Sequence, residues 1–121
     1  MQIKAEGHDL LMRLMGATTQ RRDVVAMNVA SQNMPGYRRR EVEFESLLVD
    51  AIDKGYDEAR LAEIEPEVQI DWSAEVRAVG NSVDAEKEAA LLRENRLRFE
   101  LYAAILRGRT SLVQQAISAE R

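Results

Sequence analysis

The sequence predicts an all-α protein in which two long terminal helices form an antiparallel, coiled-coil-like hairpin. Three observations favour this fold class. Apolar residues recur at helical spacing over residues 8–32, they recur every seventh residue over residues 82–118, and the stretch between them is acidic. We expect residues 33–80 to form an extended connector that is partly β or disordered. At this length, residues 1–121 form a single domain.

The N-terminal helix is predicted over about residues 8–32, because its apolar residues occupy overlapping i, i+3 and i+4 positions. Arg21 and Asn28 fall on or beside this apolar stripe. A polar side chain in such a seam either fixes the register of helix packing or contacts a neighbouring subunit. The pattern is compatible with both roles. The apolar positions are Leu10, Leu11, Leu14, Ala17, Val24 and Val25.

A Pro35-Gly36 pair ends this helix. Proline suits the second position of a β-turn, and glycine supplies the positive φ that the third position of a type II turn requires. Met34 precedes the proline and is therefore pushed out of the α region. We expect the helix to stop near residues 31–32 and the chain to leave extended through Tyr37.

The connector has weaker signals. Residues 41–45 alternate polar and apolar, as a half-buried strand does, and residues 47–52 indicate a short helix that ends near Gly55. A brief alternation over residues 68–72 is typical of an extended segment or of a two-stranded ribbon. We expect Trp72 to anchor the connector to a helix rather than to bind a ligand.

The C-terminal helix is predicted over about residues 82–118, with Asn81 or Ser82 as its cap. Its seven-residue repeat calls for a partner helix. Because two helices bury only one face of each other, the hairpin also calls for further copies or other subunits. The residues expected in the helix seam and in assembly contacts are Leu14, Val25, Leu92, Phe99, Tyr102, Leu106 and Val113.

Charge is distributed unevenly along the chain, whose net charge is −4. Residues 41–75 contain 12 acidic and 2 basic residues, so the middle of the chain is strongly acidic and the two ends are basic. These charges either lie on solvated faces or attract unlike segments of neighbouring copies.

The composition contains few of the side chains on which catalytic and metal sites are commonly built. His8 is the only histidine and the chain contains no cysteine, which leaves no thiolate metal site and no histidine-based nucleophile pair. We expect no catalytic, cofactor-binding or metal site. Residues 38–40 are three arginines beside Tyr37, but an acidic chain without repeated basic and aromatic residues does not indicate a nucleic-acid partner. Neither a lipid-spanning segment nor a cleaved signal peptide is predicted.

Two segments resemble bacterial flagellar basal-body rod proteins. That family carries the pattern Asn-Ile-Ala-Asn-x-x-Thr-Pro-Gly-Tyr after an N-terminal helix, and the matching residues here are Asn28, Ala30, Pro35, Gly36 and Tyr37. Val29 is a near match, whereas Ser31 and Met34 replace the second Asn and the Thr. The second segment resembles the Gly-Asn-x-Val-Asp-x-Glu-x-Glu block that opens the C-terminal helix of the proximal rod member, through Gly80, Asn81, Val83, Asp84, Glu86 and Glu88.

This resemblance implies a non-enzymatic structural subunit of the proximal rod, which transmits torque as part of the motor drive shaft. The implied partners are other copies of the chain, other rod proteins, the MS-ring and rod-adaptor proteins, and the flagellar type III export apparatus. The implied location is the periplasmic part of the basal body, reached without a cleaved signal peptide. Phe44 and Leu48 resemble the element by which such subunits dock at the export gate, although Phe44 alternatively anchors the strand. A small helical adaptor or export chaperone, binding partners through the heptad seam, is the alternative function.

Overall fold

The computed structural model describes the backbone of residues 2–119 and the side chains of residues 7–119. Met1, Glu120 and Arg121, which the single-domain prediction includes, lie outside the described residues. In chain order the elements are α1 (Gln2–Ala30), β1 (Arg40–Glu43), α2 (Glu45–Asp53), α3 (Glu58–Leu61), β2 (Glu67–Ile70) and α4 (Ala85–Ala119).

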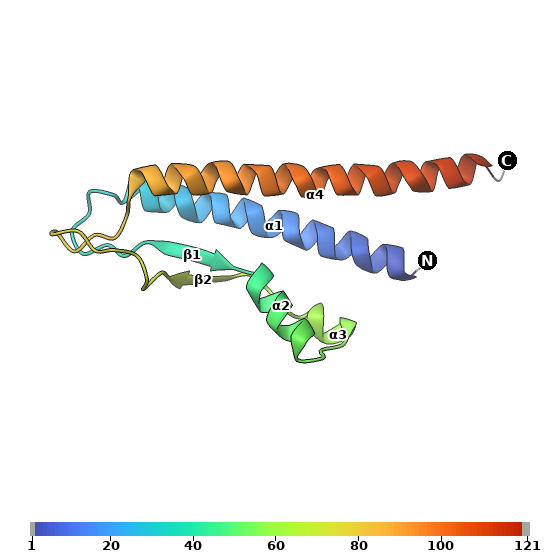
Figure 1. Ribbon diagram of the computed structural model, residues 1–121, viewed down its shortest axis with the longest axis horizontal. Coiled ribbons are helices and arrows are strands. Elements are labelled where there is room, and N and C mark those ends of the chain that lie inside the picture. The colour runs from blue at the N-terminus through green and yellow to red at the C-terminus, as the bar shows by residue number, and fades with distance from the viewer. Residues whose placement is uncertain (1, 120–121) are drawn as a thin grey trace.

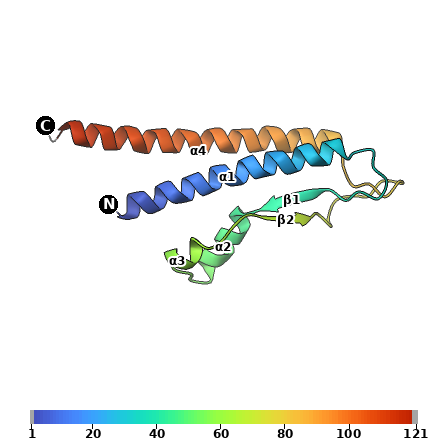
Figure 2. The same cartoon turned by 180° about the vertical axis from the view of Figure 1, so that it is seen from behind.

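The two long helices lie side by side and run in opposite directions, so that the start of α1 and the end of α4 lie at the same end of the molecule (Figures 1 and 2). The prediction of a mostly helical chain with a long helix at each end is confirmed. The strictly all-α class is inexact, because β1 and β2 pair as an antiparallel two-stranded sheet. The helix α1 begins at Gln2, earlier than the apolar periodicity indicates.

Helix α1 forms the middle layer of the structure. It contacts α4 on one side and β1 on the other (Figure 1). The ribbon is in register from Arg40 opposite Ile70 to Glu43 opposite Glu67. The acidic connector is therefore folded back along α1 as an ordered ribbon, followed at its far end by α2 and α3.

A small apolar cluster holds the connector against α1. Phe44 is completely buried and packs with Ala17 and Leu48, while Leu14 and Ile64 cover the cluster from outside. The guanidinium of Arg13 lies over the Phe44 ring, 5.4 Å from its centre. Because the chain has few aromatic residues, this one ring supplies much of the apolar surface that joins the connector to the helix.

Trp72 does not anchor the connector to a helix, and that prediction is wrong. Its side chain is 71% exposed. The guanidinium of Arg38 lies over the ring at 5.4 Å, a cation–π contact that covers one face and leaves the rest in solvent. The alternating pattern around Trp72 identifies an extended segment, but it does not say which side of the ribbon faces α1.

Polar residues occupy the most deeply buried positions of α4. Glu88 and Asn95 are buried, whereas Phe99 and Val113 remain 41% and 39% exposed. Asn95 donates from Nδ2 to the Thr18 carbonyl at 2.7 Å, which ties the middle of α4 to α1. The seam between the helices is thus specified by hydrogen bonds as well as by apolar contact. Among the described residues, no helix has the length and apolar character to cross a membrane.

Candidate functional site

The two segments that resemble rod proteins meet at the closed end of the hairpin. We call their contact the junction network, and define it by its buried or half-buried polar side chains: Asn28, Tyr37, Arg39, Asp71, Asn81, Ser82 and Glu88. These side chains come from the last turn of α1, the loop into β1, the residue after β2, the loop before α4 and the first turn of α4.

Asn28 is fully buried and uses both groups of its amide. The oxygen Oδ1 accepts from the Tyr37 hydroxyl at 3.1 Å and from the Arg40 backbone N–H at 3.0 Å. The nitrogen Nδ2 donates to the Arg40 carbonyl at 2.8 Å and to Glu88 Oε2 at 3.2 Å. Two acceptor positions and two donor hydrogens are all that an amide offers, so this position demands an asparagine.

Arg39 connects the same carboxylate to the ribbon. Its Nε donates to Glu88 Oε1 at 2.6 Å and one terminal nitrogen donates to Asp71 Oδ2 at 2.7 Å. Its backbone N–H donates to Ser82 Oγ at 2.7 Å. Burial opposes the charged guanidinium, but the hydrogen bonds and charges of Glu88 and Asp71 outweigh it, so the pKa of Arg39 lies above its ordinary value.

Asn81 closes the turn after α1 rather than the start of α4. Its Nδ2 donates to the carbonyls of Ser31 and Met34, both at 2.8 Å, and its Oδ1 accepts from the Val83 N–H at 2.7 Å. The prediction that Asn81 or Ser82 caps α4 is wrong. Asp84 takes that role, since its carboxylate accepts from the backbone N–H groups of Glu86 and Lys87 at 3.0 and 3.3 Å.

Two glycines let the loops approach each other at this end. Gly36 has φ +77° and Tyr37 N–H donates to the Met34 carbonyl at 3.2 Å, as the Pro-Gly pair predicts. Gly36 N–H donates to the Val79 carbonyl at 3.0 Å, and a Cβ on Gly80, whose φ is +81°, would lie 3.3 Å from the Gly36 Cα. A side chain on Gly80 would therefore press on the other loop, whereas a Cβ on Gly36 would meet nothing within 4 Å and is disfavoured there by the positive φ alone.

A second polar contact lies further along α1. Arg21 donates to Glu45 Oε2 at 2.7 Å and to the Val42 carbonyl at 3.0 Å, and the Tyr102 hydroxyl donates to Glu45 Oε1 at 3.5 Å. Burial acts to raise the pKa of Glu45, but the Arg21 hydrogen bond and charge leave it below its ordinary value. Burial and the Glu45 charge raise the pKa of Tyr102. This contact fastens the connector to both long helices.

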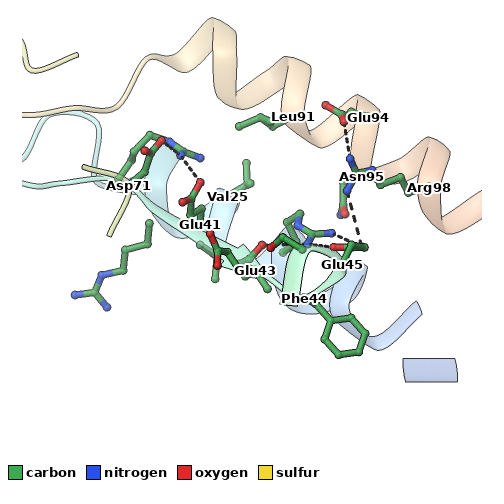
Figure 3. A pocket seen from close by; sticks show the side chains of 16 residues that line it. Val25, Glu41, Glu43, Phe44, Glu45, Asp71, Leu91, Glu94, Asn95 and Arg98 are labelled. Carbon is green, nitrogen blue, oxygen red and sulfur yellow. Dashed lines mark hydrogen bonds and ion pairs between the residues drawn. The ribbon is translucent and has the colours of Figure 1, made fainter. Parts of the chain in front are cut away.

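A pocket lies between α1, β1 and α4, and the Arg21–Glu45 pair lies at its edge. Figure 3 shows Asn95 and Arg98 of α4 on the side of Glu45, and Leu91 lines the same pocket. Arg21 is paired with Glu45, and Arg98 lies 3.8 Å from the same carboxylate. Within residues 7–119 no group of three or more His, Cys, Asp or Glu side chains is placed to hold a metal ion. The paired charges of this pocket stabilise the packing of three elements.

The predicted residues outside the network are spread over the molecule. Val83 and Val25 are buried, and Tyr102 and Leu106 are half-buried on α4. Ala30, Pro35 and Asp84 are exposed. Phe44 and Leu48 belong to the apolar cluster, and their contact with an export gate stays a prediction.

Sequence reasoning missed Arg39, Asp71 and the structural role of Glu88. Arg39 is one of three consecutive arginines, and only the extended geometry before β1 determines which of them points inward. Glu88 fits the motif that opens α4, but its acidic character fits the helix dipole equally well. Its complete burial beside an arginine depends on contacts made by residues more than 40 positions away.

Known proteins of similar sequence support the resemblance seen at residues 28–37 and 80–88. No protein-family model matches the chain. The chain is similar in sequence to flagellar basal-body rod proteins, which confirms the resemblance. It is 27% identical to the flagellar basal body rod protein FlgB of Borrelia hermsii, over 80% of this chain and 84% of that protein. It is 25% identical to FlgB of Escherichia coli K12, over 74% of this chain and 76% of that protein.

Proposed function

We propose that this chain is a non-enzymatic structural subunit of the bacterial flagellar basal-body rod. The observation that carries the proposal is the junction network. The two rod-like segments lie at residues 28–37 and 80–88, and their side chains form one buried set of hydrogen bonds. The pattern shared with rod proteins builds the closed end of the hairpin. The similarity to FlgB over most of both chains supports the same function.

We further propose that the hairpin transmits torque. A shaft subunit must resist shear between its helices, and directional hydrogen bonds resist sliding better than apolar contact does. Three such ties join the N-terminal half of α4 to the rest of the chain, at Glu88, Asn95 and Tyr102. A sliding helix would have to break them together.

Its proposed partners are other copies of the chain, other rod proteins, the MS-ring and rod-adaptor proteins, and the type III export apparatus. The proposed location is the periplasmic part of the basal body, reached without a cleaved signal peptide. The exposed apolar side chains of α4 support assembly, because large exposed apolar patches mark interaction sites.

Deleting the gene for this chain in its own bacterium tests the proposal. We expect non-motile cells without a complete rod, and we expect a tagged copy of the chain to restore motility and to remain in purified basal bodies. Motile cells with complete rods after the deletion would contradict the proposed function. An adaptor or export chaperone would also be required for motility, but it would be recovered in a small soluble complex and would be absent from purified basal bodies.

A further inference from the structure

The outward side of α4 carries an apolar stripe that none of the described residues covers. We call it the α4 stripe and define it as Leu97, Leu101, Ile105 and Leu112, which are 66%, 57%, 42% and 66% exposed. At 100° per residue these positions lie on one side of the helix, turned away from Asn95 and Tyr102 in the seam. A Cβ added to Gly108, between them, would have open space around it.

Basic residues border this stripe. Arg93 and Arg107 are exposed on α4, and Arg96 is paired only loosely with Glu100 at 3.4 Å, with 83% of its side chain exposed. Residues 93–119 contain five arginines and two glutamates. Arg98 is half-buried and paired with Glu94 and Glu45, so the exposed arginines are Arg93, Arg96 and Arg107. At 100° per residue, these three follow one border of the stripe, and the exposed Glu94 lies among its apolar positions. The face is therefore mainly apolar along its middle and positively charged along one border.

The connector presents a surface of the opposite character. We call residues 49–67, which include α3 and most of α2, the acidic lobe. They contain seven acidic and two basic residues. Val49 and Ile52 are 58% and 59% exposed, one helical turn apart on α2, with the exposed Asp53 beside them. This surface is apolar in the middle and negatively charged around it.

The two surfaces cannot meet within one molecule. Helix α4 lies on one side of α1, and α2 and α3 lie on the other (Figures 1 and 2). The apolar cluster around Phe44 and the Arg21–Glu45 pair fix the start of the lobe to α1. A second copy of the chain supplies what each surface lacks, because every copy carries both.

We propose that the α4 stripe and its arginines bind the acidic lobe of a second copy of this chain. The inference rests on the proposed function and names the contact by which successive copies would join. Because the contact uses two different surfaces, it is heterologous, and each bound copy leaves one stripe and one lobe open for the next. Such a contact forms a ring or an open helical assembly. Opposite charges also make the association dependent on salt.

Reversing the charges of one surface at a time tests this contact. One variant carries Arg93→Glu with Arg107→Glu, and the other carries Asp53→Lys with Glu63→Lys. These side chains are exposed and lie outside the junction network. Sedimentation velocity at low salt measures self-association over a range of concentrations. We expect the wild-type chain to associate and each variant alone to associate at least about tenfold more weakly.

The decisive sample is an equimolar mixture of the two variants. Each reversed surface then faces a complementary reversed surface, and each native surface faces a native one, so we expect association to return toward the wild-type level. A wild-type chain that does not associate, variants that associate normally, or a mixture as weak as its components would each overturn the proposal. Circular dichroism checks the fold. Should a reversal reduce helicity, Arg93→Gln with Arg107→Gln replaces it, with weaker association expected.

Failure of this contact is distinguishable from failure of the proposed function. Purified basal bodies that contain the wild-type chain, together with unaffected association of both variants, would remove the contact and leave the function. Restored association in the mixture, with the chain absent from basal bodies, would do the reverse.

Discussion

At the scale of single residues, the closed end of the hairpin depends on polar side chains that hydrogen-bond to one another across segments far apart in the chain. Asn28 contacts the loop before β1 and the first turns of α4 at the same time. Its neighbour Glu88 has a completely buried carboxylate that receives hydrogen bonds from Asn28 and Arg39. Buried polar groups cost free energy when a partner is lost, so each member depends on the others.

Asn28→Ala tests this dependence. The change removes the hydrogen bonds that Asn28 makes with the Arg40 backbone, the Tyr37 hydroxyl and the buried Glu88 carboxylate, and we expect the free energy of unfolding to fall by about 2–3 kcal/mol. Urea unfolding followed by circular dichroism measures it. Asn33→Ala is the matched control, since Asn33 is an exposed asparagine five residues away and its loss should change stability by less than about 0.5 kcal/mol. Equal effects of the two substitutions would contradict the role of Asn28.

Glu45 predicts how stability depends on pH. Its pKa in the folded chain lies below the ordinary 4.5, so the unfolded chain binds a proton there more readily. The stabilisation from the Arg21–Glu45 pair is therefore complete above about pH 4.5 and is lost as the pH falls through the lower folded-state pKa. We expect thermal melting between pH 3 and 6 to show a smaller loss at low pH for Glu45→Gln than for the wild-type chain. An identical acid-dependent loss would show that Glu45 does not contribute.

At the scale of elements, the loops approach closely because Gly36 and Gly80 both have positive φ. An alanine at either position strains the backbone by roughly 1–2 kcal/mol, and at Gly80 it also presses on the Gly36 backbone. Elsewhere on α1, Gly16 sits in the helix with open space around it. Alanine at Gly36 or Gly80 is thus predicted to destabilise the fold, and alanine at Gly16 to stabilise it.

Thermal melting of three variants measures this difference. We expect Gly36→Ala and Gly80→Ala to lower the melting temperature, and Gly16→Ala to raise it because alanine is favoured over glycine inside a helix by about 1 kcal/mol. A rise in melting temperature for Gly80→Ala would mean that the two loops are not in contact in solution.

The elements also show how far a sequence predicts this structure. Helical spacing and the Pro-Gly pair are local signals, and they predict α1, the turn after it and most of α4. Alternation predicts extended segments, but the side that faces the helix depends on pairing, and for that reason the anchoring of Trp72 is wrong. The junction network joins residues far apart in the chain, such as Asn81 and Ser31. The spacing of residues along the chain does not predict such contacts.

At the scale of the whole molecule, α4 is longer than the surface that covers it. Its 35 residues span about 52 Å, and every described position from Ser111 onward is exposed. A structure with one small apolar cluster and a long uncovered helix is marginally stable alone. We expect the purified chain at low concentration to melt broadly and at moderate temperature, with a melting temperature that rises with concentration. A sharp transition above about 80 °C, independent of concentration, would contradict this account.

The segments around residues 28–40 and 80–88 form one buried site. A double-mutant cycle between Arg39 and Glu88 tests it most directly, using Arg39→Met, Glu88→Leu and the double variant, with the free energy of unfolding measured by urea. Arg39→Met leaves the buried Glu88 carboxylate without its cation, and Glu88→Leu leaves Arg39 with Asp71 as its remaining close acidic partner. The double change removes both charges of the Arg39–Glu88 pair, so we predict a coupling of at least about 2 kcal/mol. Effects that add to within about 0.5 kcal/mol would contradict the claim, because residues that do not interact show no coupling.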